Sequence, residues 1–118
     1  MTQSAQSLEI KDSGQRDSFQ TGAVRDGQTG KGRFDLLPFD AIQEVARVFE
    51  AGALKYADRN WGKGMGTHRF MAAGLRHAMK HLAGWRDEPH LAMAAWNFLA
   101  LIQTEKWIAD GVLPAKLQ

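Results

Sequence analysis

Apolar residues recur at helical spacing in three segments of this chain. The first segment is apolar at Phe39, Ile42, Ala46, Phe49 and Ala53. Intervals of three and four residues are typical of an amphipathic helix with one face on the core. Pro38 suits the first turn of this helix because its missing N–H costs nothing there, and Asp40 suits the positive end. The pattern predicts a helix from Pro38 to Lys55.

A second helix is predicted over residues 67–83, with Thr67 as its N-cap and Gly84 as its stop. One face of this helix carries Phe70, Ala73, Gly74, His77 and His81.

Pro89 is expected to begin a third helix that runs to about Asp110, with Asp87 or Glu88 able to cap it. Its apolar face is predicted at Leu91, Ala94, Ala95, Phe98, Leu101, Ile102 and Ile108.

Three helices joined by short turns predict an all-α fold, a small helical bundle of three main helices. Residues 1–21 are polar, rich in Ser and Gln, and are expected to form a flexible tail, while residues 22–118 form the helical domain. We find no strand period. The many aromatic residues and Ala-lined faces predict that a second copy completes the core, so a homo-oligomer is expected.

Composition narrows the class of protein. The 118 residues include no cysteine, which excludes disulfides and thiolate metal sites. No segment is long and apolar enough to span a membrane, and the N-terminus lacks a signal-peptide pattern, so we expect a cytoplasmic protein. The net charge of +2 fits an anionic small-molecule partner and is too weak to indicate nucleic acid.

Residues 68–97 contain the candidate chemistry. This window holds Arg76, His77, Lys80, His81, Asp87, Glu88, His90 and Asn97. Polar groups set among Ala, Met and Trp need partners, which are either a ligand or each other in a structural network. His77 and His81 have the spacing of a helical metal pair, a weak signal without the Glu of the zincin motif. His90 and Asn97 point the same way and either border a cleft or are an exposed His and a backbone-bonded Asn.

Two loops add candidates. Residues 56–66 include Asn60 and Trp61, and Trp61 either stacks on a base or anchors the loop to the core. The Gly-rich residues 22–38 carry Lys31 and Arg33, which either contact phosphate or lie on a surface loop. On the first helix Glu50 flanks the apolar stripe, where it either meets a site or pairs with a neighbouring cation.

Three stretches of the chain, GKGRFDLLP, EAGALKYADRNWGKG and RHAMKHLAGWRDEPHLAMAAWN, together resemble the viral dATP/dGTP diphosphohydrolase family. The resemblance runs from about residue 22 to residue 110. This family is similar in turn to the MazG-type all-α pyrophosphohydrolases, helical oligomers that use divalent metal to cut nucleoside triphosphates into monophosphate and diphosphate. The resemblance implies a phage origin and a purine deoxynucleoside triphosphate as substrate.

The resemblance also implies roles for matching residues. Glu50, Asp87 and Glu88 are expected to hold Mg²⁺, Mn²⁺ or Co²⁺, and Glu50, Asp87 and His90 to be catalytic. The expected substrate-binding residues at matching positions are Lys55, Tyr56, Asn60, Trp61, Arg76, His77 and Asn97. Independently of the resemblance, Arg33 and Lys80 are expected to bind substrate as cations that can hold phosphate oxygens. Among them, the cationic side chains hold phosphate, and Asn60, Asn97 and Trp61 contact the base. Either His77 or His90 can orient the water or complete the metal shell.

The chain departs from the acidic signature of the MazG type, ExxE on one helix and ExxD on a later one. Here Glu44 and Glu50 are six residues apart, and the third helix has His90 and Asn97. Two main hypotheses follow: a purine deoxynucleoside triphosphate diphosphohydrolase, or a helical oligomer that binds or sequesters a nucleotide without cutting it. A purely structural assembly factor would leave the polar window unexplained.

Overall fold

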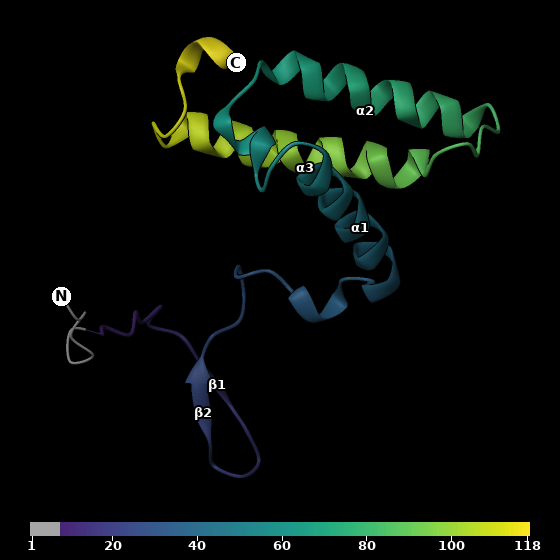
Figure 1. Ribbon diagram of the computed structural model, residues 1–118. Helices are drawn as coiled ribbons and strands as arrows, with labels where there is room; N and C mark the ends of the chain where they lie inside the picture. The colour runs from purple at the N-terminus through teal and green to yellow at the C-terminus, as the bar shows by residue number, and fades with distance from the viewer. Residues whose placement is uncertain (1–7) are drawn as a thin grey trace. The chain divides into compact units, whose positions relative to one another are not determined.

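The computed structural model describes residues 8–118, so the first seven residues of the predicted tail lie outside it. Three helices dominate: α1 (Phe39–Lys55), α2 (Thr67–Leu82) and α3 (His90–Ala109) (Figure 1). The predicted all-α helical bundle is confirmed. The chain divides after Leu37 into two compact units. None of the helices within residues 8–118 is long and apolar enough to cross a membrane.

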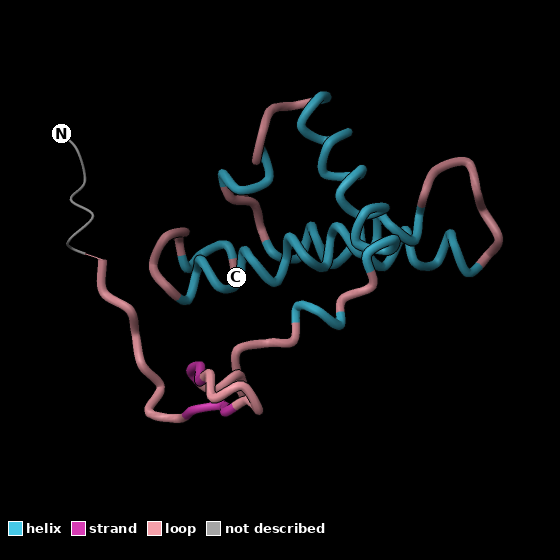
Figure 2. Tube along the Cα trace, turned by 90° about the horizontal axis from the view of Figure 1, so that it is seen from below, coloured by secondary structure: helices cyan, strands magenta, loops and turns pink. Residues whose placement is uncertain are grey.

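Helices α2 and α3 form a tightly packed helical hairpin (Figures 1 and 2). Gly74 of α2 faces Phe98 of α3, and a Cβ at Gly74 would lie only 2.5 Å from the Phe98 ring. The core of the hairpin contains the buried Phe70, Ala100 and Leu101, against which Trp61, Met65 and Trp96 pack. Glycine therefore permits an approach of the two helices that any side chain would obstruct.

Helix α1 crosses α3 (Figure 1), and more of its apolar stripe is exposed than predicted. Val45 is its buried residue, and the Phe49 ring lies 5.7 Å from that of Trp96. The predicted stripe is wrong at its N-terminal part, since Phe39 is 73% exposed and Ile42 and Ala46 are also exposed. A crossing helix contacts its neighbour over a short length only, so the rest of the apolar stripe stays uncovered.

The helix ends correct two sequence predictions and confirm a third. Thr67 is the first helical residue of α2 and Gly66 is the cap position, without a side-chain hydrogen bond. Pro89 occupies the cap position of α3, so neither Asp87 nor Glu88 caps that helix. Gly84 does follow α2, with a φ of +94° that favours glycine, as the sequence predicted.

The buried face of α3 also differs from the prediction. Leu91 and Ile102 are exposed, whereas Ala94, Asn97, Ala100, Leu101 and Thr104 are buried. Nearly every side of α3 is apolar, so the sequence pattern does not determine which side faces the core.

A short hairpin lies in the first unit, where no strand was predicted. Strands β1 (Arg16–Ser18) and β2 (Val24–Asp26) pair antiparallel, with Asp17 opposite Arg25. Asp26 accepts hydrogen bonds from Ser13 and Lys31, and the Lys31 contact is the main cause of its lowered pKa. The strands are exposed and held by ion pairs, so they leave no apolar alternation in the sequence.

Candidate functional site

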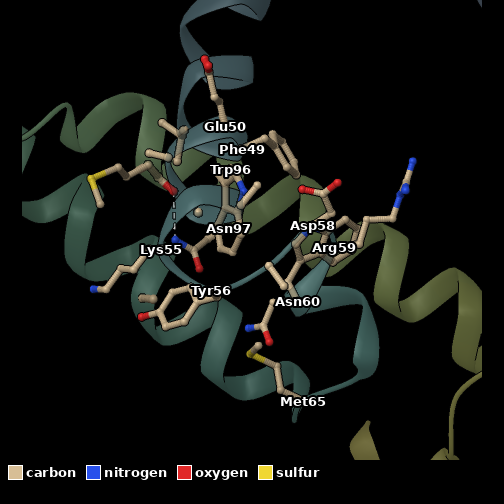
Figure 3. Close-up of a pocket in the computed structure, with 18 of the residues that line it drawn as sticks. Phe49, Glu50, Lys55, Tyr56, Asp58, Arg59, Asn60, Met65, Trp96 and Asn97 are labelled. Atoms are coloured by element: carbon tan, nitrogen blue, oxygen red, sulfur yellow. Dashed lines mark hydrogen bonds between the residues drawn. The ribbon is translucent and has the colours of Figure 1, made fainter.

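A cleft of about 1090 Å³ opens between the second half of α1, the loop that follows it, α2 and α3 (Figure 3). Eight of the predicted site residues line it: Glu50, Lys55, Tyr56, Asn60, Trp61, His77, Glu88 and Asn97. They come from all three helices and from two loops. The fold thus brings together residues up to 47 positions apart, between Glu50 and Asn97.

Five other predicted residues do not line this cleft. Arg76 is exposed on α2, and the Lys80 ammonium lies 5.2 Å from the Trp85 ring centre. Arg33 belongs to the first unit and forms an ion pair of 2.7 Å with Asp35. Asp87 and His90 contact each other beside the cleft. Of the predicted cationic residues Arg33, Lys55, Arg76 and Lys80, Lys55 therefore lines the cleft.

The loop between α1 and α2 is anchored by Trp61. Arg59 has a left-handed backbone, with a φ of 54°, and a short 3₁₀ helix (η3, Asn60–Lys63) follows it. The Trp61 ring stacks on Trp107 at 5.5 Å and meets Phe49 edge-on at 6.0 Å. One face of Trp61 is thus occupied by protein, which favours the anchoring interpretation and fixes Asn60 at the cleft wall.

Asn97 lies on the cleft side of α3 and is 6% exposed. Its Nδ2 donates a hydrogen bond of 2.9 Å to the Met93 carbonyl. In Figure 3 the side-chain oxygen of Asn97 lies toward Lys55 and Tyr56. The backbone-bonded Asn considered from the sequence is therefore present, and it leaves the amide oxygen as the group directed to the cleft.

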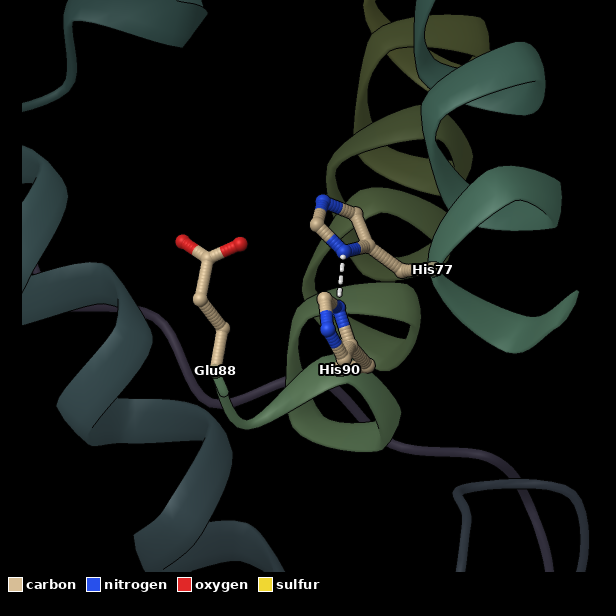
Figure 4. A group of neighbouring side chains, drawn as sticks. All are labelled: His77, Glu88 and His90. Carbon is tan, nitrogen blue, oxygen red and sulfur yellow. Dashed lines mark hydrogen bonds between the residues drawn. The ribbon is translucent and has the colours of Figure 1, made fainter. Parts of the chain in front are cut away.

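A chain of hydrogen bonds joins two histidines and an aspartate next to the cleft. The Nδ1 atoms of His77 and His90 are 2.9 Å apart and share one hydrogen bond (Figure 4). The Nε2 of His90 donates to Asp87 Oδ1 at 2.7 Å. His90 is only 1% exposed, so the alternative of an exposed histidine at the helix start is wrong. The turn after Gly84 positions Asp87 to bind the His90 side chain instead of capping α3.

The electrostatics of this chain favour an ionised Asp87 and a neutral His77. The hydrogen bond from His90 is the main cause that lowers the pKa of Asp87. Burial lowers the pKa of His77, and the charges of His90 and Arg76 lower it further, while Glu88 opposes them. A neutral imidazole has one ring nitrogen with a free lone pair, which can accept a proton or bind a metal.

His77, Glu88 and His90 form a group that could hold a metal ion. One ligand atom from each residue lies within 4.8 Å of the others. Among residues 8–118, this is the group of three or more His, Asp or Glu side chains close enough to share an ion. It differs from the set expected from the sequence, Glu50, Asp87 and Glu88, and shares only Glu88 with it. Sequence reasoning placed His77 and His90 near the ion, but it could not show that they approach each other.

Comparison with known proteins gives a family for this arrangement. Residues 21–110 match the family model described as dATP/dGTP diphosphohydrolase, N-terminal. The chain belongs to this diphosphohydrolase family. The family expected from the three sequence stretches is thereby confirmed, and its name implies a nucleotide substrate. No curated protein and no solved structure matches the chain.

Several cleft residues of this diphosphohydrolase-family domain were not predicted as site residues. They are mainly apolar and include Phe49, Met65, Met93 and Trp96. The Nε1 of Trp96 is buried and has no hydrogen-bond partner among the described residues. Their apolar positions resemble ordinary core positions in the sequence, so only the opening between α1 and α3 distinguishes them.

Proposed function

We propose that this domain hydrolyses dATP or dGTP to the monophosphate and diphosphate with the help of a divalent cation. The observation that carries this proposal is that one cleft is lined by Lys55, two Asn side chains, His77 and Glu88. Its volume of about 1090 Å³ is large enough for a nucleotide. A complex of a nucleotide with a metal ion has phosphates, a base and the ion itself. The cationic, amide and metal-binding groups of this one cleft match these three parts in that order.

The reaction is an attack of water on the α-phosphorus. The bond between this phosphorus and the oxygen that bridges to the β-phosphate breaks, and diphosphate leaves. A carboxylate oxygen of Glu88 accepts the proton of the water, and Lys55 neutralises phosphate oxygens. A bound divalent cation supplies further neutralisation and lowers the pKa of the water.

The base is proposed to bind at the amide and apolar side of the cleft. Asn60 and Asn97 can hydrogen-bond the edge of a purine, and Phe49 and Trp96 supply apolar walls. The aromatic rings of Phe49 and Trp96 are 5.7 Å apart and pack on each other, which keeps this wall rigid. A rigid apolar wall lowers the entropy lost when a planar base binds.

A second copy of the chain is proposed to cover the outer face of α2. This face carries the exposed Met71, Leu75, Met79 and Leu82. Their spacing of three and four residues makes one apolar stripe that the described chain leaves uncovered. Light scattering should show an oligomer for the native chain and a smaller species for Leu75→Lys. Arg69→Glu changes charge on another face of α2 and should leave the mass unchanged.

The enzymatic proposal is tested by incubating the protein with each of the four deoxynucleoside triphosphates plus Mg²⁺, Mn²⁺ or Co²⁺. Release of diphosphate and purine monophosphate in equal amounts is expected. Lys55→Ala should raise the Michaelis constant about tenfold, the effect of losing one charged hydrogen bond of about 1.4 kcal/mol. Lys106→Ala, distant from the cleft lining, is the control. Binding without product under all three ions would favour the nucleotide-sequestering module instead.

A further inference from the structure

The two histidines of the cleft region are arranged as a pair of metal ligands. A single proton lies between the Nδ1 atoms of His77 and His90, whichever ring carries it, because the atoms are 2.9 Å apart. An ion that binds both rings displaces this proton, lies to one side of the line between the two nitrogens and takes a lone pair from each. Two nitrogen ligands about 2.1 Å from an ion and at right angles are about 3.0 Å apart. The observed separation therefore already suits neighbouring positions around one ion.

Asp87 occupies the position of an outer carboxylate. It accepts the Nε2 hydrogen of His90 at 2.7 Å, which leaves Nδ1 of a neutral His90 with a free lone pair toward His77. Metal-binding histidines commonly donate their second N–H to a carboxylate in this way. The His90 side chain is 0% exposed, whereas that of Asp87 is 64% exposed. Asp87 is thus a positioning residue for His90, and it is not itself a ligand.

We propose that His77, Glu88 and His90 bind one transition-metal ion of the Mn²⁺, Co²⁺ or Zn²⁺ type in preference to Mg²⁺. Two imidazoles and one carboxylate suit these ions, whereas Mg²⁺ prefers an all-oxygen shell with several waters. Because His77 and Glu88 also line the cleft, the remaining coordination positions are open to water or phosphate oxygens there. The role of the ion in hydrolysis rests on the proposed function, but its binding does not.

The test is a titration of the metal-free, full-length protein with Co²⁺. Calorimetry and the visible absorption of the bound ion measure the binding during the titration. Co²⁺ is expected to bind at least 100-fold more tightly than Mg²⁺. His77→Ala and Glu88→Gln should each weaken Co²⁺ binding at least tenfold. His81→Ala is the matched control, since His81 lies one turn further along α2 and outside the group. Circular dichroism checks that each variant keeps its helices.

Asp87→Asn separates positioning from ligation. Loss of an outer carboxylate weakens metal binding about 10- to 100-fold, and the absorption spectrum of bound Co²⁺ should keep its shape because the three ligands remain. Equal affinity for Mg²⁺ and Co²⁺, or unchanged Co²⁺ binding in His77→Ala, would overturn the proposal. Metal binding without nucleotide turnover refutes the proposed function alone. If the protein hydrolyses nucleotide but its Co²⁺ binding does not depend on His77 and Glu88, the proposed metal site is refuted and the proposed function is not.

Discussion

Adding a methyl group at Gly74 tests how closely α2 and α3 approach each other. The new Cβ would lie 2.5 Å from Cε1 and 2.8 Å from Cζ of Phe98, well inside van der Waals contact. Overpacking of this kind costs about 1–3 kcal/mol. Alanine recovers about 1 kcal/mol because it is the better helix former. Gly74→Ala should therefore lower the free energy of unfolding by up to about 2 kcal/mol.

Gly52 in α1 supplies the matched control. A Cβ at Gly52 would meet no atom within 4 Å, so Gly52→Ala keeps the helix-propensity gain without the clash. It should raise the free energy of unfolding by about 0.4–1 kcal/mol. Thermal and urea denaturation of the two variants are expected to shift in opposite directions. A change of about 1 kcal/mol moves the melting temperature of a domain of this size by about 4–8 °C.

The same substitution connects packing to the site. Gly74 precedes His77 by one helical turn, so a wider spacing of α2 and α3 moves the His77 ring away from His90. Gly74→Ala should weaken Co²⁺ binding, and Gly52→Ala should not. A second substitution, Phe98→Leu, should restore part of the stability lost in Gly74→Ala, as a positive coupling in a double-mutant cycle. Equal stabilisation by both Gly→Ala changes would refute the close approach.

Three further outcomes are expected. Thr104→Val should raise the free energy of unfolding in urea by about 1 kcal/mol, because the buried Thr104 hydroxyl lacks a partner among the described residues; a loss of stability would contradict this. Arg59→Gly should raise it by about 1 kcal/mol by relieving the left-handed backbone, whereas Arg59→Ala should not. The lowered pKa of Asp87 means that its carboxylate stabilises the fold above the ordinary value of 3.8 and that this contribution is lost as pH falls through the lowered value. Melting temperatures of the native chain and Asp87→Asn should thus differ at pH 7 and converge in acid.

The local sequence was sufficient to predict where the three helices lie and to which family the chain belongs. Apolar residues recur every three to four positions in residues 39–55, and this spacing predicts a helix whichever surface the helix packs on. Gly84 follows the end of α2 with a positive φ, a conformation that glycine adopts readily because of its own lack of a side chain. Helix formation and termination depend on neighbours within one or two turns. The motifs in residues 30–97 are likewise contiguous, so the family match required no coordinates.

The tertiary structure decided which side of each helix is buried and which polar groups meet. Nearly all sides of α3 are apolar, so burial of Asn97 and exposure of Leu91 follow from its packing on α2 and α1. Whether Asp87 caps a helix or binds His90 depends on the path of the turn between α2 and α3. The contact between His77 and His90 requires α2 and α3 to approach each other closely at Gly74. The spacing of two helices depends on residues from separate segments of the chain. Periodicity gives the face of one helix, but only packing gives the separation between two.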